Sequence, residues 1–302
     1  MKLREWSAFI LLGLIWGSSF LWIKVAVQEI GPFTLVAFRL LFGLIGLLAV
    51  ASRQKRPFPR DRKILLGFLF MGVFNTALPF TLISWGETRI DSAMASILNG
   101  TVPLFTIVIA HFWLQDEKIS LPRISGLIIG FAGVVVLVSR DLGLAAMRAN
   151  IWGQLAVLAA ASSYALAATF SRKHLRGQSP LTQATMVVLI ADTLLWPGAL
   201  AFERPWHIPA LPITWLALAW LGLLGSCLAY LLYFYLINTW GATRASLVAY
   251  VFPAIGLMLG IVFLGETADW RLMLGSLLVV AGIVTVNLKV RFRPVSAAAV
   301  TK

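Results

Sequence analysis

Ionisable residues stand inside two long apolar stretches of this chain, where a charge is costly. Arg39 lies within the run 33–52, and Asp192 lies within the run 181–202. A charge at the centre of a membrane span costs about 2.5–3.5 kcal/mol, so such residues pair, face water or take part in function. Arg39 either snorkels to the nearer interface or lines an aqueous cavity. Asp192 is too short to snorkel and serves either function or a bond between helices, so both residues are candidates for coupling or gating.

Prolines inside apolar stretches mark places where the backbone is open to a ligand. In two stretches an asparagine stands four residues before a proline, and in a third a tyrosine stands three residues before one. Proline cannot donate to the carbonyl four residues earlier, so a polar backbone group is freed at membrane depth. Such groups are tolerated where they line a cavity or lie buried in protein, and kinks that only shape packing are the alternative. The candidate substrate contacts selected in this way are Asn75, Pro79, Asn99, Pro103, Tyr250 and Pro253.

Hydroxyl and aromatic side chains supply further candidates. A Ser-Ser-aromatic step recurs at residues 18–20 and 162–164. Such a step either presents hydroxyls to a ligand or lets helices approach closely. An aromatic side chain adjoins the first step, and tyrosines in the run 212–237 fall on different helix faces, so some point to the interior. The candidate substrate contacts of this group are Ser18, Ser19, Trp22, Tyr164 and Tyr230.

No enzyme signature is present. The sequence lacks a Walker motif, which excludes a built-in ATPase, and it lacks a Gly-x-Ser-x-Gly elbow. Its three histidines, His111, His174 and His207, are far apart and do not have metal-ligand spacing. A membrane enzyme would need several acids or histidines at one depth, and only Asp192 lies in the middle of a span. We therefore expect no catalytic residues, no metal and no cofactor.

The composition predicts an all-α membrane protein. The 302 residues are 60% hydrophobic and 12% charged, against roughly 25% charged in globular proteins. Apolar runs of about 20 residues are long enough to cross a bilayer as helices. The single cysteine, Cys227, excludes an intrachain disulfide. Ten transmembrane helices are expected at residues 6–27, 33–52, 64–85, 92–114, 121–139, 151–170, 181–202, 212–237, 244–264 and 271–290.

The net charge of +13 reflects the loops and does not indicate nucleic acid binding. No basic stretch is interleaved with stacking aromatics, as single-strand binding needs. Most of the 25 lysines and arginines fall on the side of the N-terminus, so the positive-inside rule places both termini in the cytoplasm. Lys24 is expected to snorkel to the outer interface rather than to contact substrate. The apolar run 6–27 is too long for a signal peptide and is expected to stay as the first span.

The same rhythm of residues appears twice, about half the chain apart. The first half has Ala95-Ser96, Pro103, Glu117, Gly126 and Gly133, and the second has Ala245-Ser246, Pro253, Glu266, Gly275 and Gly282. Each half holds five expected spans, and because five is odd the second half starts on the opposite side of the membrane. Residues 1–148 and 149–302 are therefore predicted to form two inverted five-helix repeats. Inverted repeats are typical of secondary transporters that alternate access around a central site.

The repeat predicts where each span lies. Spans one, three, four, six, eight and nine are expected to bound a central cavity, with the glycine-rich spans five and ten outside it. The glycines serve helix packing or, alternatively, a dimer interface, so a monomer or weak dimer is expected. Glu117 and Glu266 are expected to stabilise the positive N-terminal ends of the helices that follow them. Spans two and seven are equivalent, so a contact between Arg39 and Asp192 is geometrically conceivable.

The opening segment 14–20 (Leu-Ile-Trp-Gly-Ser-Ser-Phe), the doubled pattern and the ten spans resemble the drug/metabolite transporter superfamily, in particular its ten-helix EamA type. The resemblance covers essentially the whole chain and is greatest to bacterial aromatic amino acid exporters. The essential glutamate in the first helix of the four-helix multidrug relatives has no counterpart here, since Glu5 precedes that span and Glu29 follows it. Their proton-exchange mechanism therefore does not carry over. Nucleotide-sugar carriers are a poorer match because few buried cations are available to hold a pyrophosphate.

The resemblance implies a secondary transporter of the bacterial inner membrane. Its expected substrates are amino acids, aromatic and other neutral ones, with related metabolites or drugs, exported by alternating access. Its expected partners are the small-molecule substrate and the lipid bilayer, without nucleic acid or an ATPase subunit. One alternative is an exporter or importer of another small metabolite class in the same superfamily. An alternative of another kind is a membrane-embedded enzyme such as a lipid transferase.

Overall fold

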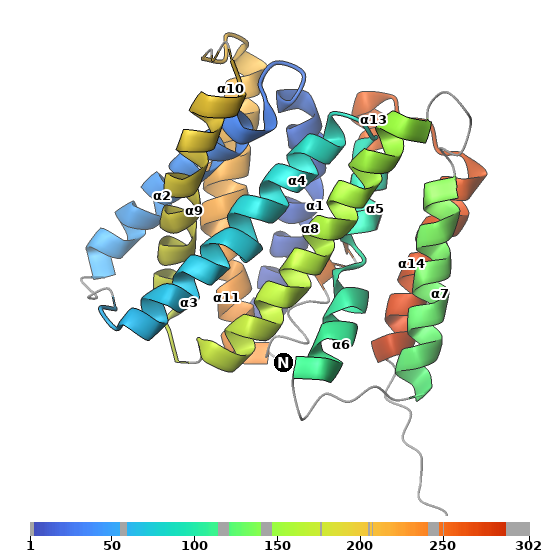
Figure 1. The fold of residues 1–302 in the computed structure, drawn as a ribbon, viewed down its shortest axis with the longest axis horizontal. Helices are drawn as coiled ribbons and strands as arrows, with labels where there is room; N and C mark the ends of the chain where they lie inside the picture. Colours follow the sequence, from blue (N-terminus) through green and yellow to red (C-terminus); the bar gives the residue numbers. More distant parts are fainter. Residues whose placement is uncertain are drawn as a thin grey trace, which may run out of the picture.

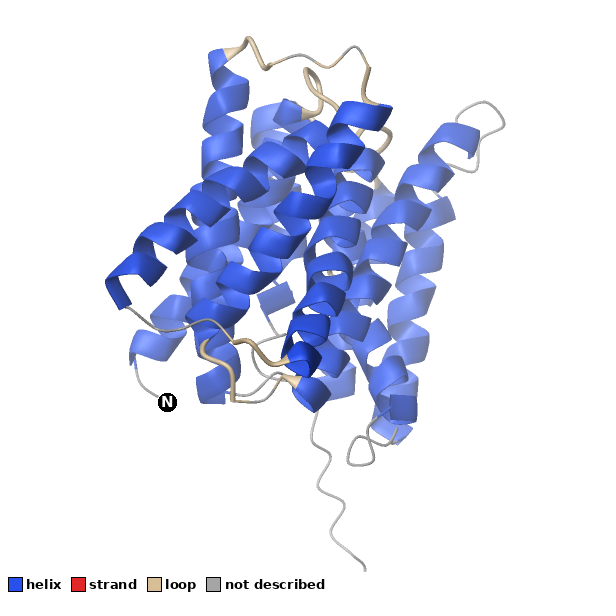
Figure 2. Cartoon of the chain, turned by 60° about the vertical axis from the view of Figure 1, so that its left-hand side comes forward, coloured by secondary structure: helices blue, strands red, loops and turns tan. Residues whose placement is uncertain are grey.

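The computed structural model is a bundle of helices (Figures 1 and 2). It describes residues 3–54, 59–113, 121–139, 147–175, 177–204, 206, 208–240, 248–249 and 251–287, and contains no strand within those ranges. The first half supplies α1 (Leu3–Ala26), α2 (Pro32–Gln54), α3 (Arg62–Gly72), η1 (Val73–Ala77), α4 (Leu78–Glu87), α5 (Ser92–Asn99), α6 (Val102–Trp113) and α7 (Leu121–Val138). The second supplies α8 (Met147–His174), α9 (Pro180–Phe202), α10 (Pro212–Ala219), η3 (Trp220–Leu228), α11 (Ala229–Trp240), α13 (Val251–Leu264) and α14 (Trp270–Asn287).

Seven helical stretches of the described chain are long and apolar enough to cross a membrane. They begin at Leu3, Pro32, Arg62, Ser92, Asn150, Pro180 and Pro212. Three shorter apolar helices, 123–138, 251–264 and 270–285, occupy the remaining expected spans. Large apolar side chains such as Ile45, Ile128 and Val262 are exposed on the outer surface, as lipid contact requires. The chain is a multi-pass membrane protein, while the ten-span count and the orientation of the termini stay predictions.

Prolines interrupt the helices in two different ways. A π-helical turn, η1, ends at Ala77, two residues before Pro79, and joins α3 to α4 without a break in the helical stretch. The fourth expected span is broken into α5 and α6, which end and begin on either side of Gly100 and Thr101, with Pro103 in the first turn of α6. Pro253 also lies in the first turn of its helix, α13, where the missing N–H costs little. Within the described residues Pro253 therefore interrupts no helix, contrary to expectation.

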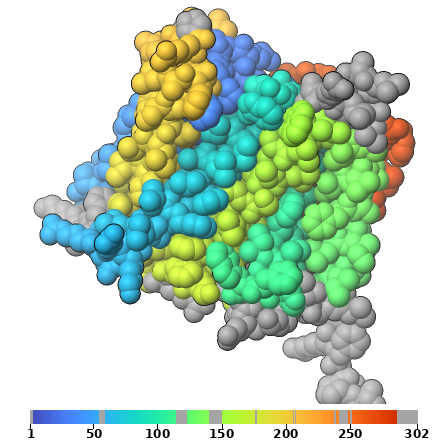
Figure 3. All heavy atoms as spheres, in the orientation of Figure 1, coloured from blue at the N-terminus to red at the C-terminus, as the bar shows by residue number. Residues whose placement is uncertain are grey.

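Glycines bring α7 and α14 into close contact. A Cβ on Gly133 would lie 2.8 Å from the carbonyl oxygen of Gly275, and one on Gly282 would lie 2.4 Å from the backbone nitrogen of Gly130. The two helices stand together at one side of the bundle (Figure 1). The glycine faces of the two halves are therefore in contact with each other within one chain. On the face shown in Figure 3, α8 lies between α4 and α6.

Glutamates of the loops hold helix N-termini of the opposite half at one end of the bundle. This end, called the capped end below, carries the loops 27–31, 88–91 and 265–269 and residues 203–204 and 208–211, and it lies opposite the N-terminus in Figure 1. Such carboxylates satisfy unpaired N–H groups and stabilise the helix dipole. Glu29 accepts hydrogen bonds at the start of α10, from the N–H groups of Ala210 and Leu211 and the hydroxyl of Thr214. Glu203 accepts from the N–H groups of Phe33 and Thr34 at the start of α2, and Glu266 from those of Ser92 and Ala93 at the start of α5.

The prediction that Glu266 stabilises the helix following it in sequence was wrong. It stabilises a helix N-terminus, but that helix is α5 in the first half and not the following helix, α14. At the start of α14, Asp269 accepts the N–H of Leu272 at 2.8 Å and supplies that cap instead. Glu117 lies outside the described residues. The caps therefore tie the two halves together, which sequence order alone does not indicate.

Candidate substrate cavity

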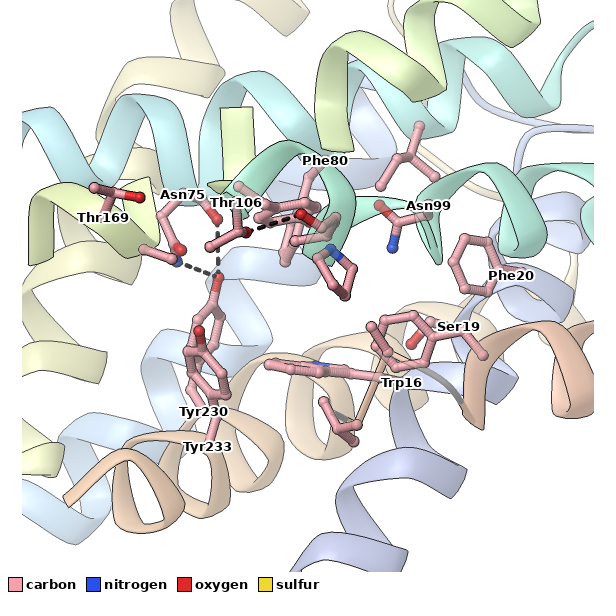
Figure 4. A pocket seen from close by; sticks show the side chains of 18 of the residues that line it. Trp16, Ser19, Phe20, Asn75, Phe80, Asn99, Thr106, Thr169, Tyr230 and Tyr233 are labelled. Carbon is pink, nitrogen blue, oxygen red and sulfur yellow. Dashed lines mark hydrogen bonds between the residues drawn. The ribbon is translucent and has the colours of Figure 1, made fainter. Parts of the chain in front are cut away.

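A cavity of about 170 Å³ lies between the two halves (Figure 4). Its wall comes from α1, α2, η1, α4, α5, α6, α8, α11, the segment 248–249, α13 and the first turn of α7. The polar and charged lining residues are Ser19, Arg39, Asn75, Asn99, Thr106, Arg123, Tyr164, Thr169, Arg172, Tyr230 and Tyr233. Two spans that were not expected at the cavity therefore line it as well: span two through Arg39, and span five through Arg123 alone. No residue of α9 or α14 lines the cavity.

One side of the cavity is held by a hydrogen-bond network between the two halves. The hydroxyl of Tyr230, on α11, donates to the carbonyl oxygen of Asn75 at 3.4 Å and accepts from Asn75 Nδ2 at 3.3 Å (Figure 4). The hydroxyl of Thr76 lies 2.8 Å from the hydroxyl oxygen of Tyr230. Proline at position 79 leaves the Asn75 carbonyl without its helical partner, and Tyr230 takes that place. The polar notch expected in the third span thus serves contact between the halves as well as the cavity wall.

A second polar group lies at the break between α5 and α6. Asn99, the last residue of α5, lines the cavity, and its side-chain oxygen Oδ1 is buried without a hydrogen-bond partner. Gly100 follows, and a Cβ there would lie 3.1 Å from Cγ of Pro253. Pro253 therefore packs against the break between α5 and α6, while Pro103 lines the cavity. Discontinuous helices of this kind build substrate sites in transporters.

Aromatic rings form a large part of the wall. Trp16 is central among them, with its ring centroid 5.1 Å from that of Tyr233, 6.1 Å from Tyr230 and 6.2 Å from Phe252. Its indole N–H donates to the carbonyl of Gly225 at 3.0 Å, which fixes the ring. Sequence reasoning missed Trp16 as a site residue. Helical spacing from Ser19, at i−3, would have found it, because residues 16, 19, 20 and 23 share one face of α1.

The structure divides the candidate residues into two groups. Those that line the cavity are Ser19, Arg39, Asn75, Asn99, Pro103, Tyr164 and Tyr230. Those outside its lining are Ser18, Trp22, Pro79, Asp192 and Pro253, and Tyr250 lies outside the described residues. Ser18 and Trp22 instead contact Trp220, whose indole N–H donates to the Ser18 hydroxyl at 3.1 Å. Of the three candidates on α1, only Ser19 therefore lies on the helix face that lines the cavity.

The two intramembrane charges have different surroundings. Arg39 is only 3% exposed and lines the cavity, so it does not snorkel to the interface. Asp192 is buried on α9, one helical turn from Trp196, and its side-chain oxygen Oδ1 has no hydrogen-bond partner among the described residues. Arg39 instead contacts Ser226 and Phe80, so the conceivable contact between Arg39 and Asp192 is not formed.

The cavity extends toward the end of the bundle that carries the N-terminus. Its lining there comes from Ala110 of α6, Arg123 at the start of α7, and Thr169 and Arg172 near the end of α8. At the capped end, Lys24 does not line the cavity, and its Nζ donates to the backbone carbonyls of Glu87 and Ile90, both at 2.8 Å. These bonds and the glutamate caps join the helices at that end, and no residue of loops 27–31, 88–91 or 265–269 lines the cavity. A polar and aromatic cavity inside an apolar helical bundle is the arrangement in which membrane transport proteins bind their substrates.

The comparisons with known proteins identify the family. The model of the EamA-like transporter family matches residues 5–139 and 151–288, so the chain belongs to that family. The uncharacterized transporter YoaV of Bacillus subtilis is 26% identical over 89% of this chain and 92% of its own length. The uncharacterized inner membrane transporter YedA of Escherichia coli K12 is 27% identical over 95% and 94%. A crystal structure matches with a TM-score of 0.69 at 19% identity, covering 95% of this chain and 97% of that one, which shows a shared fold.

Proposed function

We propose that this protein is a secondary transporter that exports amino acids, aromatic and other neutral ones, and related metabolites or drugs across the bacterial inner membrane. The observation that carries the proposal is the cavity between the halves, whose lining extends toward one end while hydrogen bonds and glutamate caps join the helices at the other. Alternating access requires such a site between two units that rock against each other. The inverted repeat of residues 1–148 and 149–302 would supply those two units.

The direction of the cavity fits a state that receives substrate from the cytoplasm. Arg123 and Arg172 line its open part, and the positive-inside rule assigns such basic ends to the cytoplasm. The glutamate caps would then face the periplasm. Export follows when the caps release and the opposite end closes. The resemblance to bacterial amino acid exporters supports this direction.

The lining supports a small amphipathic substrate. Rings of Trp16, Phe20, Phe80 and Tyr233 offer apolar surface, while amides and hydroxyls between them offer hydrogen bonds. Small-molecule sites combine a mostly apolar wall with a few placed polar groups. An aromatic or branched amino acid has both parts. Another metabolite class remains the alternative substrate.

An enzyme of the membrane has less support. Among the described residues, no group of three His, Cys, Asp or Glu side chains could hold a metal ion. Asp192, the acid expected at mid-span, does not line the cavity. A lipid transferase would need acids or histidines gathered at the site. The family match likewise favours transport.

Two threonines of similar local structure give a matched test. Thr106 lines the cavity, and its hydroxyl donates to the carbonyl of Val102 at 2.8 Å. Thr193 is exposed on α9 and donates to the carbonyl of Leu189, also at 2.8 Å. Thr106→Trp adds an indole inside the cavity, and Thr193→Trp adds the same indole on the outer surface. We expect the first change to abolish exchange of labelled phenylalanine and leucine in proteoliposomes and the second to preserve it.

Folding is checked by size-exclusion profile and by thermal unfolding of each purified variant. Exchange by the wild type is screened over neutral amino acids, and cells expressing it are scored for tolerance of toxic amino acid analogues. If folded Thr106→Trp exchanges amino acids as fast as the wild type, the cavity is not the transport route. If the wild type exchanges no amino acid, the proposed substrate class is wrong.

A further inference from the structure

Arg39 enters the cavity wall where α2 and η3 are in close contact. A Cβ on Gly222 would lie 2.7 Å from the carbonyl oxygen of Arg39, and one on Gly43 would lie 2.7 Å from Cβ of Ser226. These glycines let the two backbones approach each other. The approach brings Ser226 Oγ to 3.0 Å from Nε of Arg39. Protein contacts therefore fix the base of the guanidinium group.

The same contacts leave the outer part of the guanidinium open. The Ser226 hydroxyl donates to the carbonyl of Leu221 at 3.1 Å, so its oxygen stays an acceptor for Nε. The ring of Phe80 lies along one face of the group, with its centroid 3.8 Å from Cζ. Gly225 leaves room beside Nη2, since even a Cβ there would be 3.4 Å away. Nη1 and Nη2 have no hydrogen-bond partner within the described part of the chain.

Within the described residues, the charge of Arg39 also has no close counterion. Arginine stays protonated in proteins, and burying an unpaired charge is costly. Arg39 interacts electrostatically with Tyr164, Tyr230 and Glu87. None of these three residues makes an ion pair with it. Both carboxylate oxygens of Glu87 are buried without a hydrogen-bond partner. An anion bound in the cavity would compensate the charge and satisfy the open N–H groups at once.

We propose that Arg39 anchors the transported amino acid by binding its carboxylate through Nη1 and Nη2. The proposal rests on the amino acid export proposed above and assigns the residue that selects for an acid. The planar fork of a guanidinium matches a carboxylate with two parallel hydrogen bonds. Ser226 and Phe80 hold the fork in a fixed orientation before the substrate arrives, which lowers the entropy lost on binding.

The rest of the cavity complements the other parts of an amino acid. Asn99 Oδ1 is a buried acceptor without a partner, and an ammonium group is a donor without an acceptor lone pair. The rings of Trp16, Tyr233 and Phe252 offer an apolar wall for the side chain. Arg39 and Asn99 come from different helices, α2 and α5, and line the same cavity. The site thus combines a cation, an amide acceptor and an aromatic surface.

Three ligands of similar size separate these contributions. Phenylalanine has both charged groups, 2-phenylethylamine lacks the carboxylate, and 3-phenylpropanoate lacks the ammonium. Each competes with labelled phenylalanine for exchange by proteoliposomes of the wild type, of Arg39→Gln and of Arg39→Lys. Truncating one partner of a buried charge pair weakens binding by roughly 30-fold or more. We expect the wild type to prefer phenylalanine over 2-phenylethylamine by at least that factor, Arg39→Gln to lose the preference, and Arg39→Lys to keep part of it.

Each result decides the proposal. Equal competition by phenylalanine and 2-phenylethylamine in the wild type overturns the anchor and leaves amino acid export intact. Retention of the full preference by Arg39→Gln, or an equal loss for both ligands, also overturns it. Failure of the wild type to exchange any neutral amino acid overturns the proposed amino acid substrate and the anchor together. If neither variant folds, competition by phenylalanine methyl ester on the wild type decides, because the ester keeps the ammonium group and the ring but replaces the anion with a neutral group.

Discussion

The glutamate caps predict how the transporter is held in the state described above. Glu266 accepts two backbone N–H groups of α5, from Ser92 at 2.7 Å and from Ala93 at 2.9 Å. Hydrogen bonds to a charged group stabilise by about 1.5–3 kcal/mol each. Glu266→Gln keeps one acceptor oxygen but loses the charge and the second acceptor, so we expect a loss of about 2 kcal/mol. The cap exists only while the loop 265–269 and α5 are together, so the equilibrium shifts toward opening by about 30-fold.

Thiol accessibility measures this shift. Thr106→Cys places a thiol in the cavity, in a background where Cys227→Ala removes the native one. On the proposed topology, a membrane-impermeant maleimide added to intact cells reaches residue 106 only when the capped end opens. We expect Glu266→Gln to raise the labelling rate by up to about 30-fold. Glu5→Gln is the matched control, because Glu5 accepts from the indole N–H of Trp240 at the opposite end, at 2.8 Å.

A second variant removes the same cap by a different route. A Cβ on Gly260 would lie 2.3 Å from Oε2 of Glu266, so Gly260→Ala displaces the carboxylate without changing its charge. We expect it to raise labelling in the same way. Unchanged labelling in both folded variants would refute the reasoning that the cap holds this end closed. An equal rise in Glu5→Gln would show that loosening the bundle anywhere has the same effect.

Two further predictions test scaffold and coupling. Gly282→Ala places a methyl group 2.4 Å from the backbone nitrogen of Gly130, so we expect about 1–3 kcal/mol of destabilisation and a lower unfolding temperature in detergent. The control, Ala132→Val on the exposed face of α7, should change the unfolding temperature little. Equal unfolding temperatures of the two variants would contradict close α7–α14 packing. Asp192 is 6% exposed and lies outside the cavity lining, so Asp192→Asn should leave amino acid exchange and its response to a pH gradient close to the wild type. A selective loss of gradient-driven exchange would instead assign proton coupling to Asp192.

The effects of prolines on the helix turn that precedes them could be predicted from the sequence. Pro79 and Pro103 act on positions four residues earlier through the missing N–H, whatever the rest of the fold does. The π-turn before Pro79 and the end of α5 at Asn99 follow this rule. The partner of the freed carbonyl was not predictable, since Tyr230 comes from the other half of the chain. Its place depends on how α11 crosses η1.

The hydropathy pattern also could not predict which face of a helix lines the cavity. Successive residues are about 100° apart around a helix, so a small rotation exchanges one wall residue for another. Ser19 and Trp16 line the cavity, whereas Ser18 and Trp22 contact Trp220 instead. An apolar helix that is hydrophobic on all sides gives no moment to fix this rotation. Neighbouring helices fix it through packing.

By itself the sequence determined the membrane class, the approximate extent of the helices and the family, because hydropathy, proline chemistry and motif spacing are local properties of the chain. Tertiary structure alone decided that Arg39 lines the cavity rather than snorkelling, and that Glu266 caps α5 rather than α14. Both outcomes depend on the tilt, rotation and crossing of helices from opposite halves. Those are set by close contacts such as Gly222 with Arg39, between residues that are far apart in the chain.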